Sequence, residues 1–270
     1  GLYLNSNNED NRKEEDANQK LIQSASECIF DFLRENSSGI ENPIKLARIN
    51  FKVDDADKPI LNEYFKTLKT TWIDNFKTLP IVQTKKGNLL ASDAVFIDPL
   101  LLNDEVIFDS IFKLVDFFWS NTPIKDLTKE WTSIISEWKL EEITYVSYKD
   151  LANEIKKVGC LESIPLISEL KVLYSKMIEE GHGDLFTTHE LLPNIKGELR
   201  LLSGLNNNVN LPEILIEIAD VIMPDVPKRH INPDFKFDLE LSPYTRKNYT
   251  ADINTAISAS IKDKTFSSEI

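Results

Sequence analysis

The residues best suited to chemistry stand together in the segment Gly181-His182-Gly183-Asp184, with His189 a short distance further on. Imidazole and carboxylate groups are common metal ligands, so His182, Asp184 and His189 could form the metal site of a hydrolase. The spacing contains neither a helical pair of histidines four residues apart nor a nearby cysteine. The structural alternative is that Gly181 ends a helix and His182 lies at the negative end of the helix dipole. We favour this alternative and expect no metal site.

Two charged stretches are further candidates for ligand binding. The acidic run at residues 54–57 lacks the glycine and the distal glutamate of a calcium-binding loop, so a solvated loop explains it better than a cation site. Lys228 and Arg229 precede His230 between two prolines, where they could bind an anion or a partner protein. In a chain this acidic, a solvated linker is the simpler interpretation of the basic pair.

The composition and the motifs argue against catalysis and against nucleic-acid binding. The 270 residues contain no Gly-x-Ser-x-Gly, Walker or Gly-x-Gly-x-x-Gly pattern. With 31 Lys and Arg against 44 Asp and Glu, the net charge is −13, which repels phosphate backbones and anionic lipid. No apolar run approaches the roughly 18 residues that a membrane span needs. We expect a chain without enzymatic activity that binds neither nucleic acid nor membrane.

The two cysteines point to a reducing compartment. Cys28 and Cys160 are too few for a disulfide framework and lack metal spacing. Each lies among apolar residues in a helical pattern, which predicts a small buried core residue. No signal peptide is evident, so we expect a cytoplasmic location.

Apolar residues recur with the helical period of 3.6 through most of the chain. The first helix is expected to begin at Asp16, and its predicted core-facing stripe consists of Ala17, Leu21, Ala25, Cys28, Ile29, Phe32 and Leu33. Similar stripes predict helices at residues 61–76, 106–118, 127–138, 166–177 and 211–222. Trp72, Trp131 and Trp138 lie on such stripes and are expected in the core. Trp119 follows a helix end and is the best candidate for a partner contact.

One pattern occurs twice. Leu79-Pro80 is followed by Lys86-Gly87, and Leu192-Pro193 is followed by Lys196-Gly197. Each copy predicts a short hairpin that leads to one of the apolar helices, 106–118 or 211–222. The sequence therefore predicts an α+β fold that is mostly helical with short β-hairpins, built from two similar helix–hairpin–helix halves.

Local signals place the boundaries of these halves. Residues 143–146 predict a strand, Ser147 and Asp150 predict a capping box, and Gly159 predicts a left-handed helix end. Thr250 is expected to begin the last helix. The expected organisation is a disordered tail at residues 1–12, a first half at 13–158, a second half at 159–262 and a tail at 263–270.

The same segments resemble a known family. The first is Trp72-x3-Phe76-x2-Leu79-Pro80, followed by Ser92-Asp93-Ala94-Val95-Phe96. The second is Leu191-Leu192-Pro193-Asn194-x2-Gly197, followed by Arg229-His230-Ile231-Asn232-Pro233. Together they look like the region downstream of the ATP-binding domain in bacterial sacsin-like proteins. Those proteins are GHKL-type ATPases related to the ninety-kilodalton heat-shock chaperone. The resemblance covers most of residues 60–262.

The resemblance implies a non-catalytic interaction or relay region of a larger chaperone-like ATPase. Its partners would be its own upstream ATP-binding domain and client proteins, with ATP and Mg²⁺ bound in the parent protein and no cofactor in this chain. In such chaperones this region can supply a residue to the γ-phosphate, for which Arg200, Lys228 and Arg229 are available. The chain begins with Gly and ends at Ile270 in mid-pattern, as expected of a piece of a longer protein. The alternative is a free-standing scaffold or adaptor domain with an exposed apolar patch.

Overall fold

The structure is a computed structural model that describes residues 9–49, 59–102, 104–140, 142–208, 213–223 and 225–262. The predicted acidic loop at 54–57, the tail at 263–270 and residues 1–8 of the predicted N-terminal tail lie outside the described residues. The chain forms two compact units: unit 1 holds Gly1–Asn103 and Val115–Val146, and unit 2 holds Asp104–Leu114 and Ser147–Ile270. The predicted boundary after residue 158 thus lies within unit 2. The fold is α+β and mostly helical, as the sequence predicts.

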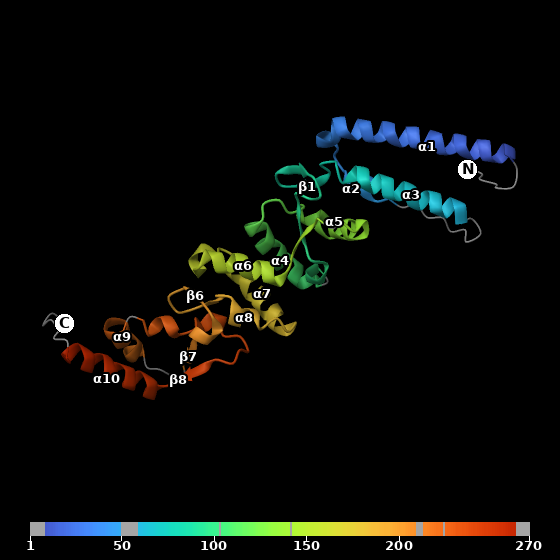
Figure 1. The fold of residues 1–270 in the computed structure, drawn as a ribbon. Coiled ribbons are helices and arrows are strands. Elements are labelled where there is room, and N and C mark those ends of the chain that lie inside the picture. Colours follow the sequence, from blue (N-terminus) through green and yellow to red (C-terminus); the bar gives the residue numbers. More distant parts are fainter. Residues whose placement is uncertain are drawn as a thin grey trace. The chain divides into compact units, whose positions relative to one another are not determined.

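Unit 1 is built on two long helices that lie alongside each other, α1 and α3 (Figure 1). Its helices are α1 (Glu9–Asn36), α2 (Ile44–Ala47), α3 (Pro59–Phe76), the end of α4 (Glu105–Phe118) and α5 (Lys125–Trp138). The first helix begins at Glu9 rather than at the predicted Asp16, so residues 9–12 of the predicted tail are helical. Phe76, Trp131 and Trp138 are buried in the core of this unit, with Trp72 packed against them, as predicted.

The strands of unit 1 form two small pairs. The predicted hairpin joins β1 (Val82–Thr84) and β2 (Gly87–Leu89) in antiparallel register. Its turn needs Gly87, whose φ of 110° lies in the left-handed region that favours glycine. The second pair is parallel, between β3 (Val95–Ile97) and β4 (Thr144–Val146), with α4 and α5 in the connection.

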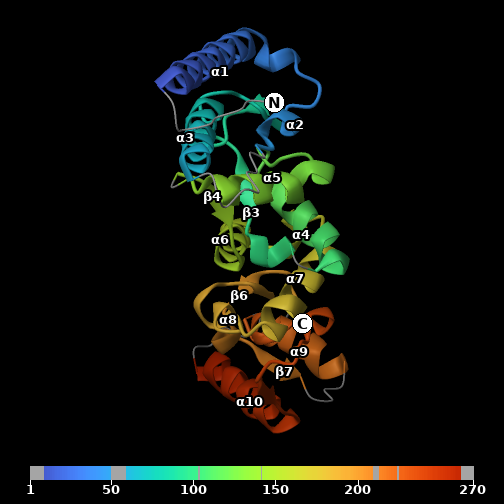
Figure 2. The same ribbon diagram turned by 90° about the vertical axis from the view of Figure 1, so that its right-hand side faces the viewer.

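Unit 2 has five α-helices besides its part of α4 within the described residues: α6 (Tyr148–Val158), α7 (Ile167–Glu179), α8 (Leu185–Thr188), α9 (Glu213–Ile222) and α10 (Arg246–Lys262). The second predicted hairpin joins β5 (Leu192–Pro193) and β6 (Leu199–Arg200), again antiparallel and again with a left-handed glycine, Gly197. A parallel pair follows, β7 (Asn206–Asn208) with β8 (Ser242–Tyr244). Helix α10 packs beside α9 (Figure 2).

The two hairpins belong to a structural repeat that extends beyond the sequence pattern. In each copy a hairpin is followed by a strand, then by an apolar helix, α4 or α9, and later by a second strand that pairs in parallel with the first. The first copy has α5 as an additional helix before its second strand. In each copy one antiparallel bridge also joins the hairpin to a later segment: Thr84, at the end of β1, to Pro123, and Asn194, directly after β5, to Ile231. The backbone amide after that bridge donates back to the hairpin at 2.9 Å in both.

The second strand of each parallel pair runs into a helix with the same kind of cap. Asp150 accepts from the Ser147 amide at 2.9 Å, and Asn248 accepts from the Thr245 amide at 3.0 Å. The predicted capping box at Ser147 and the left-handed cap at Gly159 are confirmed. The last helix begins at Arg246 rather than at Thr250, because Thr245 and Asn248 satisfy the helix start four residues earlier.

The core of unit 2 contains a cluster of aromatic rings. Tyr174 is fully buried, and its hydroxyl donates to the Leu191 carbonyl at 2.6 Å. Phe186 and Phe235 pack edge-on against its ring, with centroids at 5.2 and 6.1 Å. Burial raises the pKa of Tyr174 well above 10.0, so this hydroxyl acts as a neutral donor that fixes α7 to the segment before β5.

Candidate interaction site

Helix α1 is held on α3 by a short apolar contact. Phe30 is only 2% exposed, and its ring packs edge-on against Trp72 and Phe76 with centroids 5.4 and 5.1 Å away. Trp72 Nε1 donates to the Ser26 hydroxyl at 3.0 Å, and Arg34 donates to Asn75 Oδ1 at 2.8 Å. These contacts fix which side of α1 faces α3.

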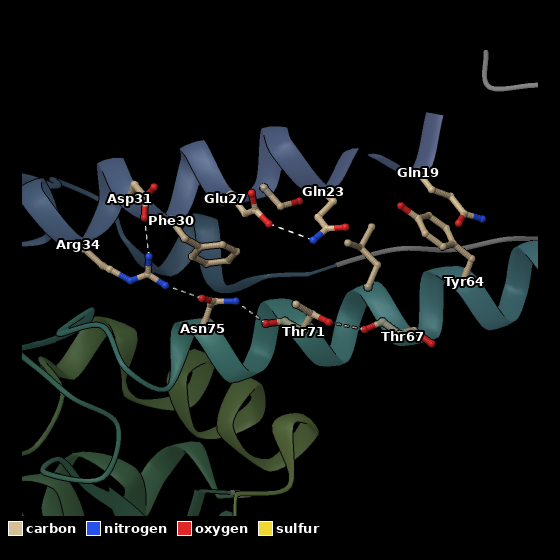
Figure 3. A pocket seen from close by; sticks show the side chains of 12 residues that line it. Gln19, Gln23, Glu27, Phe30, Asp31, Arg34, Tyr64, Thr67, Thr71 and Asn75 are labelled. Atoms are coloured by element: carbon tan, nitrogen blue, oxygen red, sulfur yellow. Dashed lines mark hydrogen bonds and ion pairs between the residues drawn. The ribbon is translucent and has the colours of Figure 1, made fainter. Parts of the chain in front are cut away.

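Between the two helices lies a pocket of about 600 Å³ (Figure 3). Gln19 and Gln23 reach into it from α1, while Tyr64, Thr67 and Thr71 reach into it from α3. Burial raises the pKa of Tyr64 above 10.0, so the phenol is a neutral donor at physiological pH. The pocket therefore combines amides and hydroxyls that can form hydrogen bonds with the apolar side chains of Phe30 and Leu68.

The opposite side of α1 is apolar and faces solvent. Leu21 is 68% exposed, Phe32 61% and Ile29 42%, and the small side chains of Ala25 and Cys28 between them are exposed as well. We call the row Leu21, Ala25, Cys28 and Phe32 the α1 seam. Its members are spaced four, three and four residues apart, so they lie on one line along the helix. Large exposed apolar rows of this kind mark contact surfaces in soluble proteins.

The exposure of the α1 seam contradicts two sequence predictions, one about the side of α1 that faces the core and one about Cys28. The sequence pattern predicts that the stripe Ala17, Leu21, Ala25, Cys28, Ile29, Phe32 and Leu33 faces the core. Leu33 is buried as predicted, but the other six are exposed, and the buried side of α1 carries Ser26, Phe30 and Leu33. Cys28, predicted to be a buried core residue, is exposed, while Cys160 is half-buried. The reason is that α1 has two apolar faces, and the shorter one holds the large ring that fits between Trp72 and Phe76.

The residues of the predicted metal alternative have separate roles. His182 packs on the ring of Tyr148 with centroids 4.8 Å apart. His189 is hydrogen-bonded to the Thr188 hydroxyl at 2.9 Å and to Asn153 Oδ1 at 3.2 Å. The Asp184 carbonyl accepts from the Thr187 hydroxyl in the turn that begins α8. In the described parts of the chain, no three His, Cys, Asp or Glu side chains are grouped as metal ligands, so the hydrolase alternative has no support here.

The predicted helix end at Gly181 is confirmed. Gly181 has a φ of 83° and ends α7 as a left-handed cap. The His182 amide donates to the Met177 carbonyl at 2.7 Å, and the Gly181 amide donates to the Ile178 carbonyl at 3.1 Å. These bonds satisfy carbonyls at the helix end, as expected of such a cap.

Sequence reasoning missed a polar network beside His182. The Tyr148 hydroxyl donates to Glu180 at 3.0 Å, and Lys176 pairs with Glu180 at 3.1 Å and with Asp104 at 3.6 Å. Burial, the bond to Glu180 and its charge raise the pKa of Tyr148. The contacts link residues from α6, α7 and the start of α4, and no local spacing could have indicated them. Their paired charges suit a structural network.

The predicted partner residues lie on both units. Trp119, in unit 1, is half-buried and packs edge-on against Phe118 at 5.9 Å. Lys228, in unit 2, pairs with Asp225 at 3.1 Å, and Arg229 is exposed. Arg200 is engaged with Glu198 at 2.6 Å, an ion pair that lowers the pKa of Glu198. Arg229 is thus the most accessible of the three cations considered for phosphate binding.

His230 is buried in unit 2 and contacts residues from several elements. Its side chain is 0% exposed, its Nε2 is hydrogen-bonded to the Tyr249 hydroxyl at 2.7 Å, and the two rings are stacked. The Tyr244 ring packs edge-on against it at 5.0 Å, and the Tyr244 hydroxyl donates to Asp252. Its backbone carbonyl accepts from Ile195 at 2.9 Å. His230 therefore joins the second hairpin to α10, a structural role that the basic context of Lys228 and Arg229 does not reveal.

The comparisons with known proteins add no relative. No protein-family model, no curated protein and no solved structure matches this chain. Among the helices of the described residues, none combines the length and the apolar character needed to cross a membrane. The function is therefore inferred from the exposed apolar surface of the chain, which includes the α1 seam.

Proposed function

We propose that this chain is a non-catalytic interaction region whose contact surface is the α1 seam. The observation that carries the proposal is the orientation of α1. The apolar row Leu21, Ala25, Cys28 and Phe32 faces solvent, while Gln19 and Gln23 on the opposite side line the pocket against α3. Exposing Leu21 and Phe32 to water is unfavourable by about 1.5 to 3 kcal/mol for each side chain relative to full burial. A partner that covers the seam recovers much of this free energy.

The proposal extends to the parent protein suggested by the sequence resemblance. Within that parent protein, a sacsin-like, chaperone-like ATPase, this chain is the cytoplasmic relay region. It contacts either the upstream ATP-binding domain or a client. The α1–α3 pair supports such a role because Phe30, Ser26 and Arg34 fix the seam on a rigid two-helix support. A free-standing scaffold would use the same seam. The length of the complete reading frame distinguishes the two, since only the relay requires a nucleotide-binding domain in the same polypeptide.

Site-specific photocrosslinking tests the contact surface. A photoreactive phenylalanine analogue placed at Leu21 or at Phe32 should give protein adducts in cells that express the chain. The same analogue at Leu100, which is 73% exposed but lies away from α1 in the 3₁₀ turn Pro99–Leu102, is the matched control. Adducts from the control but not from the seam would contradict the proposal.

A nucleotide titration tests the non-catalytic part. The isolated chain should show no saturable ATP binding by calorimetry, because the proposal assigns the nucleotide site to another domain. Binding with micromolar affinity would contradict it.

A further inference from the structure

We propose that the α1 seam binds the α1 seam of a second copy of this chain, with the two helices antiparallel. This inference rests on the proposed function and names the partner of the same surface. It starts from the order of side-chain sizes along the seam, which is large, small, small, large: Leu21, Ala25, Cys28 and Phe32. Such an order reads the same in both directions, which is what a two-fold symmetric contact requires.

A two-fold axis between Ala25 and Cys28 matches the seam to itself. Leu21 then faces Phe32 of the second copy, and Ala25 faces Cys28 of the second copy. The large side chains meet at the two ends, and the small ones meet at the centre. Small central residues let the helix axes approach to the roughly 8–10 Å typical of packed helices. In a parallel pair, each residue would face its own copy, and the two Phe32 rings would crowd one layer.

The residues that flank the seam favour the same orientation. Lys20, Ser24, Glu27 and Asp31 border it on one side, and Ile22 and Ile29 border it on the other. An antiparallel second copy brings Lys20 near Asp31 of that copy, and this happens twice because of the symmetry. The isoleucines meet on the opposite flank. A parallel copy would instead place the charged flank against the apolar one.

Both charged residues are available for this contact. Lys20 is exposed and forms no ion pair with any residue that the structure describes. Asp31 is exposed and accepts from Arg34 through Oδ1 at 2.6 Å, which leaves its second carboxylate oxygen open to another donor. The pair Lys20 and Asp31 is therefore complementary between two copies, as the side-chain sizes are.

The size of the contact predicts its strength. From Leu21 to Phe32 the seam extends about 17 Å along the helix at 1.5 Å per residue. Two such helices bury less surface than the roughly 1,200–2,000 Å² of a stable protein–protein interface. We therefore expect a reversible dimer that forms at micromolar concentration rather than an obligate one.

Sedimentation equilibrium tests the partner. The average mass of the chain should rise toward that of a dimer between about 1 and 200 µM, the range in which weak complexes assemble. Phe32→Glu should weaken the dimer at least tenfold, whereas Leu100→Glu, at a site that is also exposed but lies away from α1, should leave it unchanged. Far-UV circular dichroism checks that both variants stay folded. A chain that remains monomeric over this range overturns the proposal.

Disulfide trapping tests the orientation. In a Cys160→Ser background, one sample carries the native Cys28 alone and a second carries Ala25→Cys with Cys28→Ser. After oxidation, mixing the two should give far more cross-linked dimer than either sample alone, because the thiol introduced at position 25 of one copy faces Cys28 of the other. Efficient cross-linking within each separate sample would indicate a parallel pair and overturn the antiparallel proposal.

The two proposals fail in different ways. If another protein covers the seam, photocrosslinking from Leu21 and Phe32 still gives adducts, but their mass does not correspond to two copies of this chain. In that case the chain alone is monomeric in the centrifuge. If the seam is no contact surface at all, both experiments are negative.

Discussion

Acidification should destabilise unit 2 through His230. Burial lowers the pKa of this imidazole from 6.5 to about 4, and the charge of Arg229 acts in the same direction. Between these two values the unfolded chain holds a proton on His230 that the folded chain does not. The unfolded state therefore binds more protons in this range, and the free energy of unfolding falls as the pH drops. Above about pH 7 both states are neutral, and the effect vanishes.

The magnitude follows from the two pKa values. One pKa unit corresponds to about 1.4 kcal/mol, so the full effect at low pH is roughly 3 kcal/mol. At pH 5 the unfolded chain is largely protonated at this position and the folded chain is largely not. The loss of stability relative to pH 7 should then be about 2 kcal/mol.

The matched variant is His230→Phe, which keeps a ring beside Tyr249 but cannot titrate. It retains Arg229 and Asp252, the charged groups around the ring, so the difference between the two pH profiles isolates the imidazole. Urea unfolding at pH 7 and pH 5 measures the profiles. Hydrogen exchange of α10 reports unit 2, while fluorescence reports unit 1, because Trp72, Trp119, Trp131 and Trp138 all belong to unit 1.

The free energy of unfolding of the wild-type chain, relative to that of His230→Phe, should fall by about 2 kcal/mol between pH 7 and pH 5. A parallel loss of stability in both proteins would refute the reasoning, since it would show that the imidazole titrates alike in both states.

Three further changes test the local structure. Phe30→Ala should lower the free energy of unfolding of unit 1 by about 3–5 kcal/mol, measured in urea titrations followed by fluorescence. Phe32→Ala, on the other face of the same helix, should change it by under about 0.5 kcal/mol. Equal effects of the two variants would mean that α1 is oriented differently. Gly197→Ala should cost about 1–2 kcal/mol in thermal unfolding because its φ of 82° strains any other residue, while Gly204→Ala, outside that region, should cost less. Ser147→Ala removes the capping box and should cost about 1 kcal/mol, read from hydrogen exchange in α6; unchanged exchange there would contradict the role of the cap.

Local patterns in the sequence predicted most of the individual elements. The hairpins at Gly87 and Gly197, the capping box at Ser147 and the left-handed cap at Gly181 all depend on residues within a few positions of each other. The backbone preferences of glycine and the hydrogen bonding of serine and aspartate act over the same short range. These features could therefore be recognised without knowledge of the rest of the chain.

The parallel strand pairs could not be recognised in this way. Val95 pairs with Thr144 and Asn206 with Ser242, and each pair closes a long connection. The segment Asn206–Asn208 contains no apolar residue, so it gives no strand pattern of its own. Its backbone becomes a strand because Ser242–Tyr244 lies beside it, and the repeat in the structure is consequently longer than the repeat in the sequence.

By itself, the sequence determined which residues of α1 are apolar and where they recur along the helix, because this depends only on residue type and the helical period. Only the tertiary structure decided which apolar face is buried. Trp72 and Phe76 on α3 accommodate the ring of Phe30, and that contact turns Leu21 and Phe32 toward solvent. Burial is a property of the neighbouring element, so the seam that carries the proposed function could be found only after α3 was in place.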